Sequence, residues 1–144
     1  MRRLKSRRGS AIIELSLLFT VILLLLLGTV DFAFVIQEAM TVSEAAYAGA
    51  QYGAISGNAT NFTQMQTIAT NAAKNVSGFS VTASEWCACS PGGTAVSCAS
   101  TCTTYGVPIA YVQVSTSATA SLLFKFTGLP LTVPLHGLCI LRVQ

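Results

Sequence analysis

The chain has 144 residues, of which 52% are hydrophobic and only 9% are charged, so it is too apolar for an ordinary soluble domain and too short for two domains. Its net charge of +3 comes from the N-terminus, and the rest of the chain is slightly acidic. That balance argues against a nucleic-acid partner, because nucleic-acid-binding domains cluster their lysines and arginines on the folded part. Five of the eight cations precede residue 9, namely Arg2, Arg3, Lys5, Arg7 and Arg8.

A long apolar segment follows these cations. Residues 11–30 contain Glu14 as their only charged side chain. A helix of about 20 residues crosses the hydrocarbon core of a bilayer, which is about 30 Å thick, and cations on one side keep that end in the cytoplasm. We therefore predict a single transmembrane segment over residues 11–30, with a cytoplasmic N-terminus, membrane lipid around the helix and the rest of the chain on the other side.

Three interpretations of this segment compete, and Glu14 separates them. A secretory signal peptide normally has a shorter apolar region followed by a small-residue cleavage site, and neither is present. A plain uncleaved anchor gains nothing from a carboxylate, which costs roughly 2.5–3.5 kcal/mol at the centre of a membrane helix. In a prepilin-type leader, cleavage between Gly9 and Ser10 removes residues 1–9 and leaves a new α-ammonium group on Ser10.

The third interpretation gives Glu14 a partner. Its carboxylate in one subunit would neutralise the Ser10 ammonium of a neighbouring subunit, a sizeable electrostatic gain in an apolar setting. We therefore favour a cleaved, pilin-like subunit. The alternatives are an uncleaved single-pass envelope protein and a small secreted binding module whose apolar segment is only an export signal. The N-terminal residue of the mature protein distinguishes the three.

Residues 7–55 also carry a set of motifs in a fixed order. Arg8-Gly9-Ser10-Ala11 is followed by Glu14, by a leucine run that ends in Gly28-Thr29-Val30-Asp31-Phe32, and by an alanine-rich stretch over residues 45–54. These motifs resemble the TadE-like proteins, the pseudopilins of tight-adherence (Flp) pilus systems. The chain departs from the family pattern in the alanine-rich stretch, where Tyr47, Ala48 and Gln51 replace the common Arg, Glu and Arg.

The resemblance implies a minor pilin-like subunit of the bacterial inner membrane. A prepilin peptidase would cleave it between Gly9 and Ser10, and its body would lie in the periplasm or become part of an extracellular pilus. Its partners would be other pilins or pseudopilins and the pilus assembly platform, in a homo- or hetero-oligomer. The implied function is pilus assembly or secretion in support of adhesion and biofilm formation.

We predict one continuous helix over residues 10–55, because no proline interrupts this range and apolar residues recur at helical spacing after Val30. Its second half is amphipathic and should pack on the body. Asp31 is expected to mark the outer end of the membrane segment, where a charge returns to water. The Ala/Gly-rich residues 45–54 permit close approach of another backbone, from either the body or a second subunit. The apolar stripe consists of Phe32, Val35, Ile36, Ala39, Met40, Tyr47 and Ala50.

Residues 56–144 are predicted to form an extracytoplasmic body. Asn61 is placed to cap a second, short helix over residues 62–76, because apolar residues recur there at three- and four-residue intervals. Lys74 in the last turn and Gly78 just after it are the expected stop signals.

Alternation of apolar and polar residues then predicts three strands. They cover residues 79–86, 109–120 and 131–143, with an extension of the second through Leu122–Phe126 left open and a break in the third near Pro134–Gly137. The fold class is therefore α+β, with a small antiparallel sheet of about three strands covered on one face by the amphipathic half of the long helix.

Four of the five cysteines lie within 16 residues, in a long loop predicted after residue 86. Outside the cytoplasm such a cluster indicates disulfides, and a zinc site is disfavoured because the spacings are not the usual tight C-x2-C pairs. Two bridges should join Cys87 and Cys89 to Cys98 and Cys102, since a bridge from Cys87 to Cys89 would close a strained small ring. Which cysteine pairs with which stays open. Cys139 is left as a buried thiol or, less favoured, as an intersubunit bridge.

No catalytic, metal-binding or cofactor-binding residue is predicted. His136 is the single histidine and is expected in a solvated turn beside Pro134. No acidic residue lies near it in the sequence to orient it for nucleophilic catalysis. Glycine-rich phosphate loops and paired carboxylates do not occur, so we expect a structural or assembly protein rather than an enzyme.

Overall fold

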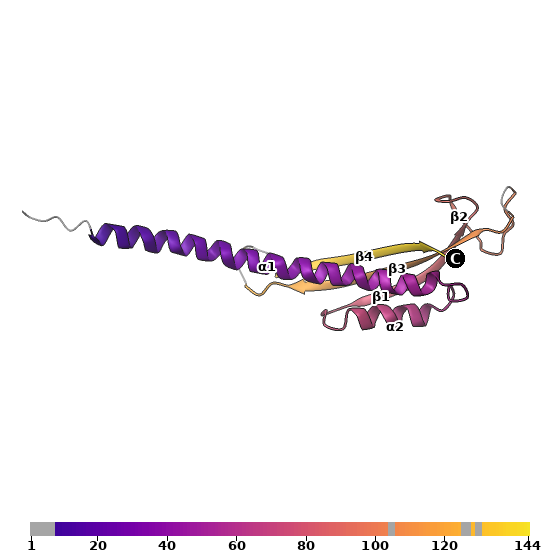
Figure 1. The fold of residues 1–144 in the computed structure, drawn as a ribbon, viewed down its shortest axis with the longest axis horizontal. Coiled ribbons are helices and arrows are strands. Elements are labelled where there is room, and N and C mark those ends of the chain that lie inside the picture. Colours follow the sequence, from indigo (N-terminus) through magenta and orange to yellow (C-terminus); the bar gives the residue numbers. More distant parts are fainter. Residues whose placement is uncertain (1–7, 104–105, 125–127, 129–130) are drawn as a thin grey trace, which may run out of the picture.

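The computed structural model describes residues 8–103, 106–124, 128 and 131–144. A long helix, α1 (Arg8–Ala54), projects well beyond a body that contains a short helix, α2 (Phe62–Ala72), and an antiparallel sheet (Figure 1). The predicted α+β fold, with a long N-terminal helix, a short second helix and a C-terminal antiparallel sheet, is confirmed. Most of the predicted leader, residues 1–7, lies outside the described residues.

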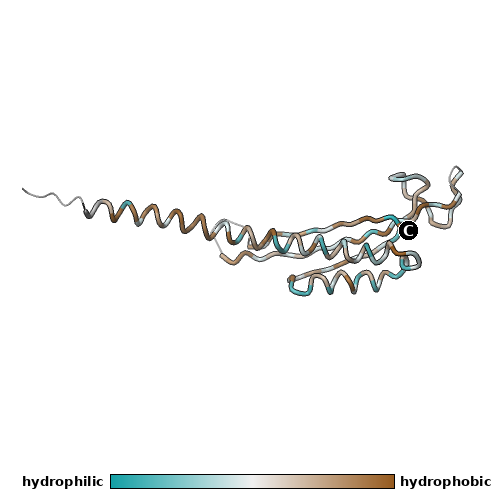
Figure 2. Tube along the Cα trace, viewed as in Figure 1, coloured by the Kyte–Doolittle hydropathy of each residue, from teal (hydrophilic) through white to brown (hydrophobic). Residues whose placement is uncertain are grey.

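The two halves of α1 lie in different environments. From Ile12 to Leu26 every large apolar side chain is exposed, whereas Val42, Ala46 and Ala50 are completely buried against the body. Figure 2 shows the projecting half as an almost continuous hydrophobic stretch and the packed half as a mixture. In the described part of the chain, α1 is the one helix long and apolar enough to cross a membrane.

The sheet has four antiparallel strands in the order β2-β1-β3-β4. Sequence analysis did not predict the two-residue strand β2, because a pairing this short leaves no periodicity to read. β2 pairs with Cys87 and Ala88 at the end of β1, so β1 also extends beyond the predicted residue 86. The strands are β1 (Ser80–Ala88), β2 (Ala95–Val96), β3 (Ile109–Ser121) and β4 (Thr132–Arg142).

β4 runs without a break through Pro134 and Gly137, so the interruption predicted there is wrong. β4 is an edge strand. A proline is tolerated in an edge strand because the N–H group that it lacks can be one that would face solvent rather than a neighbouring strand. The extension of the second strand is also not observed, since β3 ends at Ser121. Residues 125–126 of that predicted extension lie outside the described residues.

α2 begins where predicted and ends earlier. Asn61 caps it by accepting a hydrogen bond from the backbone N–H of Gln64 at 3.3 Å, as the sequence indicated. The helix ends at Ala72 rather than at residue 76, because the backbone of the C-cap residue Ala73 leaves the helical conformation, with φ −111° and ψ 31°. Lys74 therefore lies beyond the last helical turn.

Both helices pack on one face of the sheet and enclose two core clusters. Small residues allow the backbones to approach closely at two points. A Cβ atom on Gly49 would lie 2.9 Å from the Met65 carbonyl oxygen, and one on Gly137 would lie 2.8 Å from the Val42 carbonyl oxygen. The buried residues of the first cluster are Ala46, Ala50, Met65, Val112 and Val114, and those of the second are Val42, Ala118, Ala120 and Leu135.

The predicted apolar stripe of α1 is only partly correct. Phe32, Ile36, Met40 and Tyr47 are exposed. The face buried against the body is instead formed largely by small residues, which bring the helix axis closer to the sheet than bulky side chains would allow. The Ala/Gly-rich residues 45–54 therefore pack on the body of the same chain. Of the two partners that the sequence left open for this stretch, the body and a second subunit, the structure shows the body. The buried small residues there are Ala45, Ala46, Gly49, Ala50 and Gly53.

Candidate functional site

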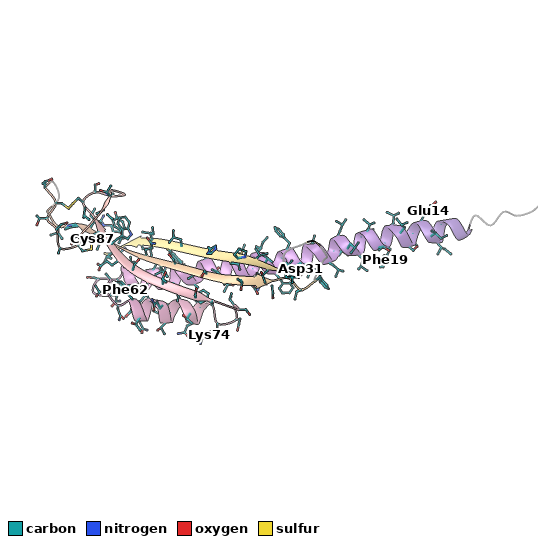
Figure 3. All side chains as sticks on the ribbon, turned by 180° about the vertical axis from the view of Figure 1, so that it is seen from behind. Glu14, Phe19, Asp31, Phe62, Lys74 and Cys87 are labelled. Atoms are coloured by element: carbon teal, nitrogen blue, oxygen red, sulfur yellow. A yellow bond between two sulfur atoms is a disulfide. The ribbon has the colours of Figure 1, made fainter. Side chains whose placement is uncertain are left out.

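Gly9 and Ser10, the predicted cleavage site, fall in the first turn of α1. Glu14 follows Ser10 by four residues, which places it about 6 Å further along the helix axis and on the same side of the helix. Its side chain is exposed on the projecting half of α1 (Figure 3). The helix thus presents one carboxylate beside the position where cleavage would create a positively charged N-terminus.

The other polar side chains of residues 11–30 are matched to a lipid environment. The hydroxyl groups of Ser16, Thr20 and Thr29 each donate a hydrogen bond of 2.8 Å to a carbonyl oxygen of the preceding turn. A hydroxyl group without a partner costs free energy in hydrocarbon, and these bonds within the helix avoid that cost. The segment can therefore face lipid all round, with Glu14 as its one charged residue.

Asp31, directly after this segment, is not exposed to water as the sequence suggested. Its side chain is only 6% exposed. One carboxylate oxygen accepts the backbone N–H of Leu123 at 2.8 Å, and the other accepts that of Phe124 at 3.2 Å. These donors belong to the β3–β4 connection, more than 90 positions away in the sequence. Asp31 thus ties the end of the apolar half of α1 to the body.

Two disulfides staple the loop at the opposite end of the body. Cys87 pairs with Cys98, and Cys89 pairs with Cys102. The predicted bridging between the two cysteine pairs is confirmed, and the structure selects one of the two connectivities that the sequence left open. Each bridge closes a loop of about a dozen residues, for which roughly 3 kcal/mol of stabilisation is typical.

The disulfides also decide what chemistry this loop can perform. The carboxylate of Glu85 lies within 4.8 Å of the sulfur atoms of Cys87 and Cys98, an arrangement that in a reduced protein would suggest metal ligands. Because the two sulfurs are bonded to each other, neither is a thiolate. The group therefore acts as a structural staple in this state.

His136 and Cys139 both lie on β4, and His136 is not in a turn as predicted. His136 pairs with Ser117 on β3 and is exposed on the sheet face that no helix covers. Cys139 is half-buried on the opposite face, beside the larger core cluster, which agrees with the favoured thiol interpretation. The strand alternation places the two side chains on opposite faces of the sheet, so they do not form a catalytic pair.

A long apolar helix that enters a disulfide-stapled α+β body is the architecture of a candidate single-pass membrane-anchored protein. The family model described as TadE-like protein matches residues 9–51, so the resemblance indicated by the N-terminal motifs is confirmed over that range. The matched range holds Gly9, Ser10, Glu14 and Asp31 and ends within α1, before the sheet begins. The match covers less than a third of the chain, so the similarity to TadE-like proteins concerns the N-terminal helix. Searches of curated proteins and of solved structures find no match.

Proposed function

We propose that this chain is a pilin-like assembly subunit of a bacterial tight-adherence (Flp-type) pilus or secretion system. Its basic leader, residues 1–9, would be removed between Gly9 and Ser10 by a prepilin peptidase at the cytoplasmic face of the inner membrane. The mature subunit would start with the apolar half of α1 in the bilayer and hold its body in the periplasm. The observation that carries this proposal is Glu14, four residues after Ser10 in an otherwise uncharged segment that faces outward along its length.

The electrostatics favour assembly over a solitary anchor. A carboxylate at the centre of a membrane helix costs roughly 2.5–3.5 kcal/mol, and Glu14, which lies near the cytoplasmic end of the segment, would cost less than that because its side chain can reach toward the interface. Opposite unit charges roughly 4 Å apart gain about 4 kcal/mol at an effective dielectric constant of about 20. A Ser10 ammonium of a neighbouring subunit would therefore offset the cost of Glu14. Cleavage creates that ammonium and removes the cationic leader at the same time.

The body suits a subunit exposed outside the cytoplasm. Its two disulfides persist in an oxidising compartment. The partners we propose are other pilins or pseudopilins, the assembly platform, the prepilin peptidase and inner-membrane lipid, in a homo- or hetero-oligomer that supports adhesion and biofilm formation. Nothing in this role requires catalysis by the chain itself.

The intact mass of the protein purified from its native membrane tests the processing step. We expect a mature chain that starts at Ser10. A Gly9→Leu variant should retain Met1, because a bulky residue replaces the small one before the cleaved bond. Gly28→Ala is the matched control and should be processed normally, since a Cβ at Gly28 meets nothing within 4 Å. An intact leader on the unmodified protein would favour the uncleaved anchor, and a start beyond about residue 30 would favour the secreted module.

A second experiment tests the role of Glu14. The Glu14→Leu variant should be inserted and cleaved, but its assembly with neighbouring subunits, measured by cross-linking in membranes, should fall by about tenfold or more, because the ammonium loses a partner worth more than 1.4 kcal/mol. Glu44→Gln, which removes an exposed carboxylate from the body half of α1, is the control and should assemble normally. Equal cross-linking of the two variants would contradict the ion-pair mechanism.

A further inference from the structure

The end of the body nearest the projecting half of α1 exposes an unusual amount of apolar surface. On the β3–β4 connection, Leu123 is 57% exposed, Phe124 38% and Leu131 53%. On α1, the two residues that flank Asp31 in the sequence are also exposed, Phe32 at 67% and Val30 at 45%. Connecting loops normally run through water and are polar, and a cluster of large exposed apolar side chains marks an interaction surface. We call these five residues the junction patch.

Asp31 fixes the position of the junction patch along the axis of α1. Its two hydrogen bonds hold the backbone of Leu123 and Phe124 against the helix at residue 31. The Asp31 carboxylate is buried by this contact, so the one charged side chain next to the patch among the described residues is shielded from solvent. Figure 3 shows Asp31 at the point where the bare part of α1 meets the body.

We propose that the junction patch sits in the headgroup region of the outer leaflet and that its partner is the lipid surface. The apolar segment of residues 11–30 spans about 30 Å as a helix, which is the thickness of the hydrocarbon core. Its outer end therefore falls at Val30, which is next to Asp31 along the helix axis. We call the two hydrogen bonds between Asp31 and the loop the clasp at Asp31. The inference rests on the membrane anchoring of the proposed function and adds that the body itself contacts lipid, which sets its depth and tilt.

The opposite end of the body supports this choice of partner. The described part of the Cys-rich region between β1 and β3 consists mainly of small and polar residues, and Val107 is its one strongly exposed large apolar side chain. Figure 1 places that region at the end of the body farthest from the projecting helix. The two ends of the body thus differ, with a mainly polar end far from the projecting helix and an apolar end where the membrane surface would lie.

Quenching of tryptophan fluorescence by brominated lipids tests the proposal in the full chain. Trp86 is the only tryptophan, and it stacks on Tyr111 at a ring-centroid distance of 4.6 Å, so Trp86→Phe gives a background that keeps an aromatic ring in the stack. Phe124→Trp in this background is inserted into phosphatidylethanolamine–phosphatidylglycerol vesicles. We expect lipids brominated near the headgroup end of the acyl chain to quench most of its emission, and acrylamide in the water to quench little.

Two control positions calibrate the result. Leu18→Trp lies on the exposed apolar half of α1 and should be quenched by deeply brominated lipids, whereas Val107→Trp should be quenched by acrylamide alone. Adding Asp31→Ala to the Phe124→Trp chain should shift quenching from lipid to acrylamide, because the loop loses its attachment. A folded Asp31→Ala chain, shown by retention of both disulfides, makes that comparison valid.

The outcomes separate this inference from the proposed anchoring. If Leu18→Trp is quenched by lipid while Phe124→Trp behaves like Val107→Trp, the anchor stands and the contact of the junction patch with lipid is refuted. If Phe124→Trp is shielded from both quenchers, another protein chain covers the patch and the lipid assignment is wrong. If Leu18→Trp is not quenched by lipid, the anchor and the patch proposal fail together.

Discussion

At the scale of single residues, burial controls the reactivity of Cys139. It is the one free cysteine of the described residues, and it lies half-buried on the helix-covered face of β4. Burial raises the pKa of the Cys139 thiol, because the interior disfavours the charged thiolate. The thiolate is the species that reacts with alkylating reagents and disulfides.

We therefore expect Cys139 to be alkylated more slowly in the folded chain than in the unfolded chain at mildly alkaline pH. The slower alkylation of the folded chain follows from the direction of the pKa shift. An unfolded cysteine ionises near pH 8.5, whereas the folded thiol stays protonated there and ionises only at higher pH. Iodoacetamide labelling followed by intact-mass measurement under non-reducing conditions, with and without urea, gives both rates.

A neighbouring position on the same strand supplies the control. Leu138 is exposed on the uncovered face of the sheet, so Leu138→Cys combined with Cys139→Ser should be labelled at nearly the same rate in both states. Equally fast labelling of native and unfolded Cys139 would show that the thiol is accessible. That result would favour the interpretation of Cys139 as part of an intersubunit bridge.

Asp31 shows what the sequence contains about a residue and what it omits. Its position directly after the apolar segment was clear, and it was predicted to mark the membrane boundary in contact with water. Its hydrogen-bond donors are backbone N–H groups of Leu123 and Phe124, which every residue except proline supplies. No local pattern identifies such donors, so the burial of Asp31 was not predictable from the sequence.

At the scale of elements, periodicity predicted the existence and type of both helices and of the three longer strands. It failed on α1 where residue size mattered more than hydrophobicity. Large apolar residues such as Ile36 and Met40 were assigned to the packed face, but the packed face is rich in alanine and glycine. Close approach of a helix to a sheet requires small side chains. The spacing of hydrophobic residues alone does not indicate which face has them.

Gly49 tests this close approach. A Cβ there would lie 2.9 Å from the backbone oxygen of Met65 and 3.3 Å from the Cβ of Ala69, so Gly49→Ala forces α1 and α2 apart. We expect a loss of about 1–3 kcal/mol in the free energy of unfolding of the body, the usual cost of overpacking. Chemical denaturation in detergent, followed by circular dichroism, measures it.

Gly28→Ala is the matched change in the same helix. It meets no neighbouring atom within 4 Å, and alanine favours a helix over glycine by up to about 1 kcal/mol, so the unfolding of the body should be unchanged or slightly harder. If Gly49→Ala left the body as stable as Gly28→Ala does, the contact with α2 would not limit the size of residue 49, and the close-approach interpretation would be wrong.

At the scale of the whole molecule, the core of the body does not include the projecting apolar half of α1. In the described structure, both core clusters draw on α1 only from Val35 onward. The segment Ile12–Leu26 exposes all its large side chains and contributes nothing to either cluster. The chain thus consists of an exposed apolar helix segment joined to a separately packed α+β body, and the two meet at Asp31.

We therefore predict that a fragment of residues 31–144 folds without a membrane. It keeps the clasp at Asp31, every α1 residue of the two clusters and both disulfides. The expected observations are a cooperative thermal unfolding transition and a non-reducing mass that shows two bridges. Because Phe32 and Met40 are exposed in this fragment and exposed apolar surface promotes association, the measurement is made at low protein concentration.

A shorter fragment of residues 43–144 locates the part of α1 that the body needs. It removes the clasp together with Val35, Ala39 and Val42, the α1 contribution to the second cluster. Complete burial of one valine is worth about 1.5–3 kcal/mol, and the loss of all three side chains and of the Asp31 hydrogen bonds is comparable with the total stability of a small domain, about 5–15 kcal/mol. The shorter fragment should therefore unfold without a cooperative transition. If instead residues 31–144 failed to fold while the full chain in detergent did, the membrane half of α1 would be part of the folding unit, and the division of the molecule at Asp31 would be wrong.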